Sequence, residues 1–272
     1  MKRACVVACL RGGLGNRLFA VAAAYGQAEA SGRACYVKDL GPSEHSGRGY
    51  ADTVFAAFAA FEIGDPKDAP RRWCEPGNRC LCYDGPVARG VPRHVSIVLD
   101  GYFQNEKYLE GRKDAFVRLL RLPALAPEPG ALFVHARHGD YLAVPLHAVD
   151  LSRYYARALA LARATFGTRL RRILLFSDDP ACETVAGAGD TPVEVVRDAD
   201  ETVALARMAA CELGGVCANS TFSWWGAYLG MAPGKLVAFP DTWFNFPPDR
   251  GPDGGDFADD VAFAGSVRVP CA

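Results

Sequence analysis

Short apolar segments alternate with segments of helical period along most of this chain of 272 residues. The first apolar segment, residues 2–10, ends at Arg11-Gly12-Gly13, and residues 14–30 then carry apolar side chains at helical spacing. Strands that alternate with helices are joined by right-handed crossovers, which make the strands parallel. The sequence therefore predicts an α/β fold, in which ligands bind beyond the carboxyl ends of the strands.

The rest of the chain continues this alternation. We expect further strands at residues 34–37, 95–99, 131–136, 172–176, 193–196, 216–218 and 235–239, and helices at residues 51–63, 106–122, 152–165, 201–210 and 222–229. Residues 40–50 and 64–94 are rich in Gly, Pro and Arg, which is typical of loops. Three prolines within residues 123–130 indicate a linker, so we expect two Rossmann-like lobes, residues 1–125 and 126–272.

The formal net charge of −1 gives no general attraction to nucleic acid or to an anionic membrane. No apolar run approaches the about 20 residues that a membrane span needs, and no signal-peptide pattern is present. We therefore expect a cytoplasmic protein without a transmembrane segment, whose ten cysteines stay reduced. Peripheral attachment to a membrane and the oligomeric state stay open.

Two patterns suggest metal ligands, and both have a simpler explanation. Cys74, Cys80 and Cys82 have no second cysteine pair nearby, which favours an irregular loop over a zinc site. Asp198-Ala199-Asp200 precedes an expected helix with Glu201 in its first turn, which favours capping over metal binding. We expect no metal site.

A glycine-rich turn, which includes Gly13, Gly15 and Asn16, joins the first expected strand to the first helix. Glycines let the backbone approach a ligand, and the N–H groups of a helix start favour an anion. A purely structural turn is an equally good interpretation. A dinucleotide fingerprint is excluded, because Val37 is followed by Lys38 where that motif needs an acid.

A second group of polar residues, His135 to Tyr141, follows the expected strand at residues 131–136. Side chains two apart on a strand share a face, so His135 and Arg137 are expected on the same side. Gly139 then turns the chain and presents Asp140. A guanidinium at a strand end suits a diphosphate, since it offers paired donors and keeps its proton. The alternative is a structural ion pair between Arg137 and Asp140.

The third group, Asn219, Ser220, Thr221 and Phe222, joins an expected strand to an aromatic helix. Such residues cap helices in many proteins, and their hydroxyl and N–H groups also bind phosphate. Trp224 and Trp225 are adjacent, so we expect one of them to line a pocket rather than the core.

Together these motifs resemble the family of α-1,2-fucosyltransferases, glycosyltransferase family eleven. The resemblance covers most of the chain and consists of Gly12 to Phe19 (G-G-L-G-N-R-L-F), Gly101 to Tyr108 (G-Y-F-Q-N-E-K-Y), His135 to Tyr141 with His147 and Tyr154-Tyr155, Phe176 to Asp179 (F-S-D-D), Asn219 to Leu229 (N-S-T-F-S-W-W-G-A-Y-L), and Pro240 to Trp243. The last long motif, Asn219 to Leu229, is the most specific.

The resemblance implies a two-lobed GT-B fold, GDP-L-fucose as donor substrate without a further cofactor, and a galactose-terminated glycan as acceptor. It implies inversion at fucose C1, with the acceptor on the N-terminal lobe and the donor on the C-terminal lobe. Arg137 would contact the β-phosphate, and Asp178 or Asp179 would hold the guanosine. The other implied donor-site residues are Gly13, Gly15, Asn16, His135, Asn219, Ser220, Thr221 and Phe222, and Gln104 and Glu106 would lie nearer the acceptor.

The expected chemistry needs a charge stabiliser and a base. Negative charge grows on the departing diphosphate, and fixed donors such as Arg137 stabilise that charge without a metal. The acceptor hydroxyl must lose its proton, and Asp140, His147 and Asp150 are the candidate bases.

The sequence departs from the family pattern in three places. His138 replaces a second Arg, Arg17 replaces a Gln and could restore that charge, and residues 212–214 do not match the family's Cys-Lys-His. Two alternatives follow. The fold could serve another acceptor or nucleotide sugar, or the chain could be a retired enzyme that binds a glycan or nucleotide without transfer.

Overall fold

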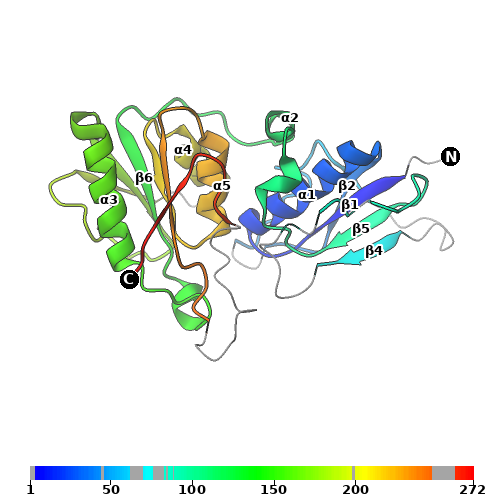
Figure 1. Ribbon diagram of the computed structural model, residues 1–272, viewed down its shortest axis with the longest axis horizontal. Coiled ribbons are helices and arrows are strands. Elements are labelled where there is room, and N and C mark those ends of the chain that lie inside the picture. Colours follow the sequence, from blue (N-terminus) through cyan, green and yellow to red (C-terminus); the bar gives the residue numbers. More distant parts are fainter. Residues whose placement is uncertain are drawn as a thin grey trace. The chain divides into compact units, whose positions relative to one another are not determined.

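The computed structural model describes residues 4–43, 46–61, 70–75, 83, 85–87, 89–197, 200–246 and 261–272. The chain divides into two compact units, Met1–Leu122 and Pro123–Ala272, and each has its own parallel sheet (Figure 1). This confirms the predicted α/β fold. Within the described ranges, no helix combines the length and the hydrophobicity needed to cross a bilayer.

Unit 1 is built on a sheet with the strand order β3-β2-β1-β5-β4. The strands are β1 (Cys5–Leu10), β2 (Ala34–Asp39), β3 (Ala59–Ala60), β4 (Arg71–Cys74) and β5 (Ile97–Asp100), and all their pairings are parallel. β1 lies in the middle of this order, and all six of its residues are buried. An apolar strand without alternation is what a parallel sheet covered on both faces requires.

Helix α1 (Leu14–Ser31) follows β1 directly, as predicted. Its alanine-rich sequence favours a helix, and Gly32 ends it in the left-handed conformation at φ +68°, with its N–H directed to the carbonyls of Ala28 and Glu29. Gly26 allows a close approach, because a Cβ there would lie 1.8 Å from the carbonyl oxygen of Tyr108.

Three expectations for unit 1 are wrong. Residues 51–57 form turns with i to i−3 bonds, such as Ala56 N–H to the Thr53 carbonyl, and β3 follows instead of a continuing helix. Pairing with β2 outweighs the helical pattern there. Gly111, at φ +70°, divides the helix expected at 106–122 into the 3₁₀ turn η2 (Glu106–Leu109) and the helix α2 (Lys113–Leu119).

The third error is β4, an edge strand that lies inside the region expected to be loop. Its four residues are all exposed, so the segment carries no buried-strand pattern. Cys80 and Cys82, which belong to the zinc pattern, and Asp198 and Ala199, which belong to the D-x-D pattern, lie outside the described residues.

Unit 2 has the strand order β11-β10-β9-β6-β7-β8, again parallel. The strands are β6 (Ala131–Ala136), β7 (Arg172–Ser177), β8 (Val193–Val196), β9 (Gly214–Val216), β10 (Leu236–Pro240) and β11 (Val267–Val269). Helix α3 (Ser152–Phe166) covers one face of the sheet, and α4 (Glu201–Ala210) and α5 (Thr221–Gly230) cover the other (Figure 1). The sequence pattern missed β11.

The core on the α3 side joins the sheet to the helix through apolar and aromatic side chains. Leu132 and Val134 of β6 pack with Tyr154 and Leu159 of α3, all completely buried. The Tyr154 hydroxyl donates within 2.8 Å of the carbonyl oxygens of Cys217 and Ala238, which satisfies a polar group deep in the core.

Helix α5 is buried on every side, which contradicts the expectation that one tryptophan lines a pocket. Trp224 is 1% exposed and Trp225 is 0% exposed. Trp224 Nε1 donates to the Val261 carbonyl at 2.6 Å, and its ring stacks on Tyr228 at 4.5 Å between centroids. The C-terminal segment around Val261 therefore covers the helix surface that we expected to be open.

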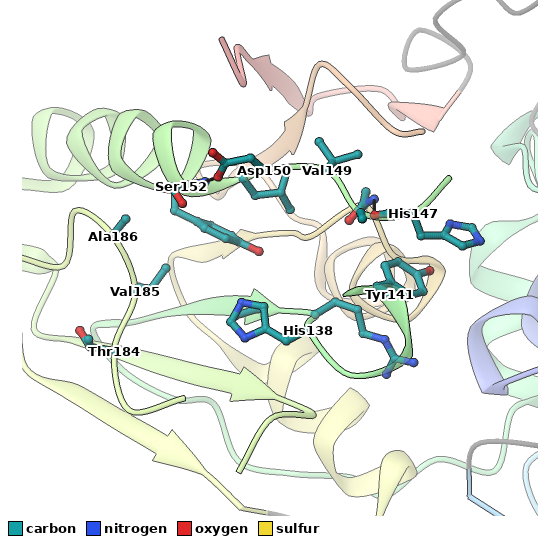
Figure 2. Close-up of a pocket in the computed structure, with 15 residues that line it drawn as sticks. His138, Tyr141, His147, Val149, Asp150, Ser152, Thr184, Val185 and Ala186 are labelled. Carbon is teal, nitrogen blue, oxygen red and sulfur yellow. Dashed lines mark hydrogen bonds between the residues drawn. The ribbon is translucent and has the colours of Figure 1, made fainter. Parts of the chain in front are cut away.

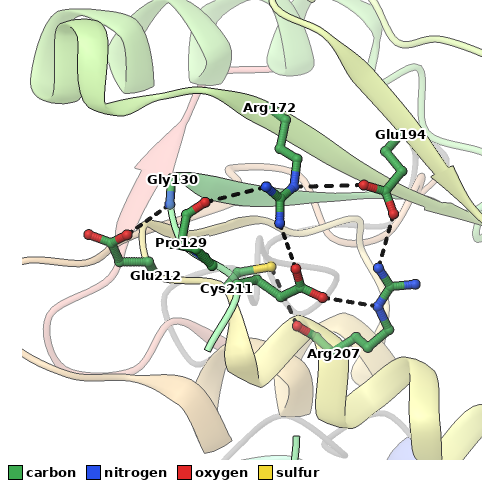
Figure 3. A network of polar contacts seen from close by, with 8 residues as sticks. Pro129, Gly130, Arg172, Glu194, Arg207, Cys211 and Glu212 are labelled. Carbon is green, nitrogen blue, oxygen red and sulfur yellow. Dashed lines mark hydrogen bonds and ion pairs between the residues drawn. The ribbon is translucent and has the colours of Figure 1, made fainter. Parts of the chain in front are cut away.

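A network of two arginines and two glutamates lies at the start of β7 and β8 (Figure 3). Glu128 accepts from Arg172 Nη2 at 2.6 Å and from Arg207 Nε at 3.3 Å, and Arg207 Nη2 reaches Glu194 at 3.1 Å. The network ties the segment that follows Pro123 to β7, β8 and α4. The linker expected at residues 123–130 is therefore held against unit 2 over its second half.

The replacement Glu128→Ala should lower the free energy of unfolding by about 1–2 kcal/mol, because it leaves two half-buried guanidiniums with one carboxylate between them. Denaturant unfolding measures this change. The control is Glu183→Ala, which removes an exposed ion pair with Arg197 and should cost less than about 0.5 kcal/mol. Equal losses in both variants would contradict a structural role of the network.

Candidate active site

A cavity of about 520 Å³ lies at the carboxyl end of β6, within unit 2 (Figure 2). It is lined by Ala136, Arg137, His138, Tyr141, His147, Ala148, Val149, Asp150, Leu151, Ser152, Tyr155, Thr184, Val185, Ala186 and Asn219. This size and this mixture of apolar and polar walls are typical of small-molecule sites. The position agrees with the expectation that ligands bind beyond the strand ends.

Asp178 fixes Arg137 at this cavity. Arg137 Nη1 lies 3.0 Å from Asp178 Oδ2, and the backbone N–H of His138 donates to Asp178 Oδ1 at 2.8 Å. Gly139 makes the turn possible, because a Cβ there would lie 2.1 Å from the Asp178 carboxylate. Arg137 thus forms an ion pair with Asp178, and the alternative pair with Asp140 stays a prediction. The side chain of Asp140 lies outside the described part of the structure.

Aromatic contacts link Arg137 to His147. The guanidinium carbon of Arg137 lies 5.1 Å from the ring centre of Tyr141, and that ring stacks on His147 at 4.6 Å with 21° between the planes. Figure 2 shows Tyr141 and His147 side by side at one end of the cavity. Arg137 and His147, both expected to be catalytic, therefore line one cavity, with Tyr141 between them.

Asn219 holds the segment that carries His147. Its Nδ2 donates to the carbonyl of His147 at 3.1 Å and to the carbonyl of Trp243 at 3.0 Å, and the residue is 3% exposed. The family-like motif thus begins with a residue that both lines the cavity and fixes its wall.

Asp150 lies at the start of α3, on the other side of Val149 from His147 (Figure 2). It accepts the backbone N–H of Ser152 at 2.9 Å, and this hydrogen bond lowers the pKa of its carboxyl group. A carboxylate stabilised in this way is a weaker base.

The loop after β7 forms the remaining wall and was not recognised from the sequence. Thr184, Val185 and Ala186 carry no chemical signal, and only the fold brings them to the cavity. Gly187 allows the loop to press on α3, since a Cβ there would lie 2.5 Å from the Cα of Ala156.

Of His135 and Arg137, only Arg137 is among the residues that line the cavity. His135 is 4% exposed and packs against Phe222 at 5.8 Å. Burial, with the nearby charges of Arg137 and His138, lowers the pKa of His135 to about 3. Its imidazole is therefore neutral at physiological pH.

Ser220, Thr221 and Phe222 form the start of α5. The Ser220 hydroxyl accepts the Phe222 N–H at 3.3 Å, which is a helix N-cap, and none of the three is among the residues that line the cavity. Asp179 accepts the N–H of Ala181 at 2.9 Å in a turn, and its Oδ2 lies 3.5 Å from Nδ1 of His138. The predicted donor-binding roles of these residues stay predictions.

In unit 1, the predicted residues gather at the carboxyl ends of β1 and β5. Asn16 Oδ1 accepts Gln104 Nε2 at 2.9 Å, which joins two of the motifs, and Gly13 is the N-cap residue of α1, two residues before Gly15. Arg17 is 1% exposed and donates to the carbonyls of Gly12 and Gly41, and its suggested role of restoring the charge missing at His138 stays a prediction.

The described residues include no group of three or more His, Cys, Asp or Glu side chains placed to hold a metal ion. Asp200 caps α4 by accepting the Thr202 N–H at 2.8 Å, as the capping explanation of the D-x-D pattern predicted for this residue.

The two parallel α/β units match the GT-B fold of a solved glycosyltransferase. The fucosyltransferase NodZ from Bradyrhizobium matches with a TM-score of 0.52 over 83% of this chain and 93% of NodZ, at 16% sequence identity. NodZ α-1,6-fucosyltransferase co-crystallized with GDP matches with a TM-score of 0.53 over 83% and 92% of the two chains, at 15% identity. At this identity the likeness establishes the fold.

The curated relatives are glycosyltransferases. The O-antigen biosynthesis glycosyltransferase WbnK of Escherichia coli is 26% identical over 168 residues, so the match spans about half of each protein, 54% of this chain and 55% of WbnK. An α-1,2-colitosyltransferase of Escherichia coli is 23% identical over 88% of this chain and 92% of its own length. No protein-family profile matches the sequence.

Proposed function

We propose that this chain is a galactoside α-1,2-fucosyltransferase, which transfers L-fucose from GDP-L-fucose to the 2-hydroxyl of a terminal galactoside. The observation that carries the proposal is Arg137, which lines a cavity beyond the end of β6 and is fixed there by Asp178. The motif resemblance supports the donor and the linkage, and the glycosyltransferase relatives support the reaction class.

In the proposed reaction, the bond between fucose C1 and the β-phosphate oxygen breaks, and the acceptor O2 bonds to C1 from the opposite face. GDP leaves with the electron pair, and the β-linked donor gives an α-linked product. Arg137 stabilises the charge that grows on the diphosphate, because its guanidinium keeps its proton and lines the cavity. No metal ion takes part in this scheme.

We propose that His147 removes the proton from the acceptor hydroxyl. Its ring lines the cavity and is separated from Arg137 only by Tyr141, whereas Asp150 is committed to the start of α3. Geometry therefore favours His147 over Asp150 as the general base. The roles predicted for Gly13, Gly15, Asn16 and Asp140 stay predictions.

A second candidate is α-1,2 transfer of colitose. One observation favours it, the match to an α-1,2-colitosyltransferase along 88% of this chain. Both candidates use the cavity and Arg137 in the same way and differ in the sugar. An assay with both donors separates these two candidates from a retired enzyme, which would bind a glycan or nucleotide without transferring a sugar.

The purified chain, incubated with GDP-L-fucose and a panel of galactosides, should form an α-1,2-fucoside at the same rate with and without a chelator. Mass spectrometry detects the product, and NMR identifies the linkage. Transfer only from nucleotide-activated colitose would favour the second candidate. Tight GDP binding with no transfer from either donor would favour the retired enzyme, and activity that requires added manganese would contradict the metal-free reaction.

The replacement Arg137→Ala should lower kcat by about 10²–10³-fold, the loss typical when one fixed donor is removed from developing charge. Asp178→Asn keeps Arg137 but removes the carboxylate that fixes its position. We therefore expect a smaller loss of kcat, about 10- to 100-fold, from misplacement of the guanidinium. Glu183→Gln, an acid-to-amide change at an exposed ion pair, is the matched control and should leave kcat unchanged. Near-normal turnover of Arg137→Ala would rule out its assigned role.

The replacement His147→Gln should lower kcat and remove the fall in rate toward acidic pH, because the group that must be deprotonated is gone. The measurement is the pH profile of kcat for both proteins. GDP affinity is the internal control and should change little. If the variant keeps the acidic limb of the profile, another group is the base.

A further inference from the structure

A second cavity, of about 260 Å³, lies in unit 1. It is lined by Gln27, Ala30, Ser31, Arg33, Pro86, Arg89, Val91 and Arg93. Sites for drug-sized ligands have volumes of roughly 300–1,000 Å³. This cavity is smaller and therefore suits one compact chemical group.

The cavity lies at the opposite end of α1 from the glycine-rich turn. Gln27 and Ser31 belong to the last turns of the helix, whereas Gly13 precedes its first residue. A helix of 18 residues is about 27 Å long at 1.5 Å per residue. Arg33 directly precedes β2, so this cavity lies at the amino ends of the strands and apart from the motif residues of unit 1.

Among the described residues that line the cavity, three carry a positive charge and none carries a negative one. Arg33 is only 4% exposed, and its guanidinium donates to the carbonyl oxygens of Val91, Pro92 and Val95 at 2.8–3.1 Å. Arg89 and Arg93 are exposed at the rim. Across the described part of the chain, none of these three arginines forms an ion pair with a carboxylate.

Arg33 is therefore a buried cation whose protein partners are neutral. A guanidinium stays protonated in proteins, and a buried charge without a counter-charge destabilises the folded state. Burial and the like charge of Arg93 both lower the pKa of Arg33. A bound anion would offset this cost.

The carbonyl end of α1 does not cancel the attraction for an anion. The N–H of Arg33 bonds to the carbonyl of Ala28 at 2.9 Å, and the Ser31 hydroxyl bonds to the carbonyl of Gln27 at 2.6 Å. Since these carbonyls are covered by donors, the three guanidiniums dominate the local charge.

We propose that this cavity binds the phosphate group of a phosphate monoester or diphosphate. Guanidinium forks match phosphate oxygens, and Arg33 provides a fixed base for the site while Arg89 and Arg93 close over the anion from the rim. The site is additional to the proposed fucosyl transfer and does not depend on it. The phosphate could belong to a soluble ester or to the headgroup of an anionic lipid, and the two arms of the test distinguish these sources.

The first arm measures equilibrium binding of radiolabelled inorganic pyrophosphate to the full chain, with GDP in excess to compete at Arg137. The test variant is Arg89→Gln/Arg93→Gln, because removing Arg33 would also unfold the turn it holds. Arg118→Gln/Arg121→Gln removes the same charge from two exposed arginines elsewhere in unit 1. We expect GDP-insensitive binding that weakens with salt and falls about tenfold or more only in the first variant.

The second arm measures cosedimentation with phosphatidylcholine vesicles that do or do not contain phosphatidic acid. Binding that requires phosphatidic acid, and is lost only in Arg89→Gln/Arg93→Gln, would support the site and assign it to lipid phosphate. Binding of pyrophosphate alone would support the site and assign it to a soluble ester. No binding of either probe, or equal losses in the two double variants, would overturn the proposal.

Discussion

The ion pair between Arg137 and Asp178 depends on the parallel pairing of β6 and β7. Ala136 lies opposite Ser177 in that pairing, so the next residue of each strand, Arg137 or Asp178, leaves the sheet beside the other. Both oxygens of Asp178 are occupied, one by the guanidinium and one by the N–H of His138. β6, which Arg137 directly follows, is buried along its whole length. Fixed donors of this kind are what stabilises developing charge without reorganisation.

Much of the strand and helix framework around Arg137 can be predicted from the sequence, because each element has a local pattern of residues. The apolar run of β6 and the polar residues that follow it placed Arg137 at a strand end, and the motif order placed His147 nearby. The ion pair of Arg137 with Asp178 was not predicted. Strand register brings Asp178 to the guanidinium from 41 residues away. The local pattern around Arg137 does not record which distant strand pairs with β6.

Other errors have the same origin, since local period says little about what surrounds an element. Residues 51–57 bury Val54 and Phe55, yet through turns that lead into β3 rather than through the expected helix. Trp224 and Trp225 both fit inside because the C-terminal segment covers the outer side of α5. The loop at Thr184 lines the cavity without any polar motif. In each case tertiary packing decides, and no local pattern of residues records it.

Arginines are abundant in this chain, and their counter-charges separate structural roles from functional ones. Arg172 and Arg207 each form ion pairs with Glu128 and Glu194, so their charges stabilise contacts within unit 2. Arg137 pairs with the carboxylate of Asp178 and lines a cavity, so its positive charge lies where a ligand can bind. Arg33 differs from these arginines, since it is buried and its partners in the described part of the chain are neutral carbonyls. A buried cation without a counter-charge at a cavity favours the binding of an anion. The bound anion offsets the free-energy cost of burying that charge, which otherwise destabilises the folded chain.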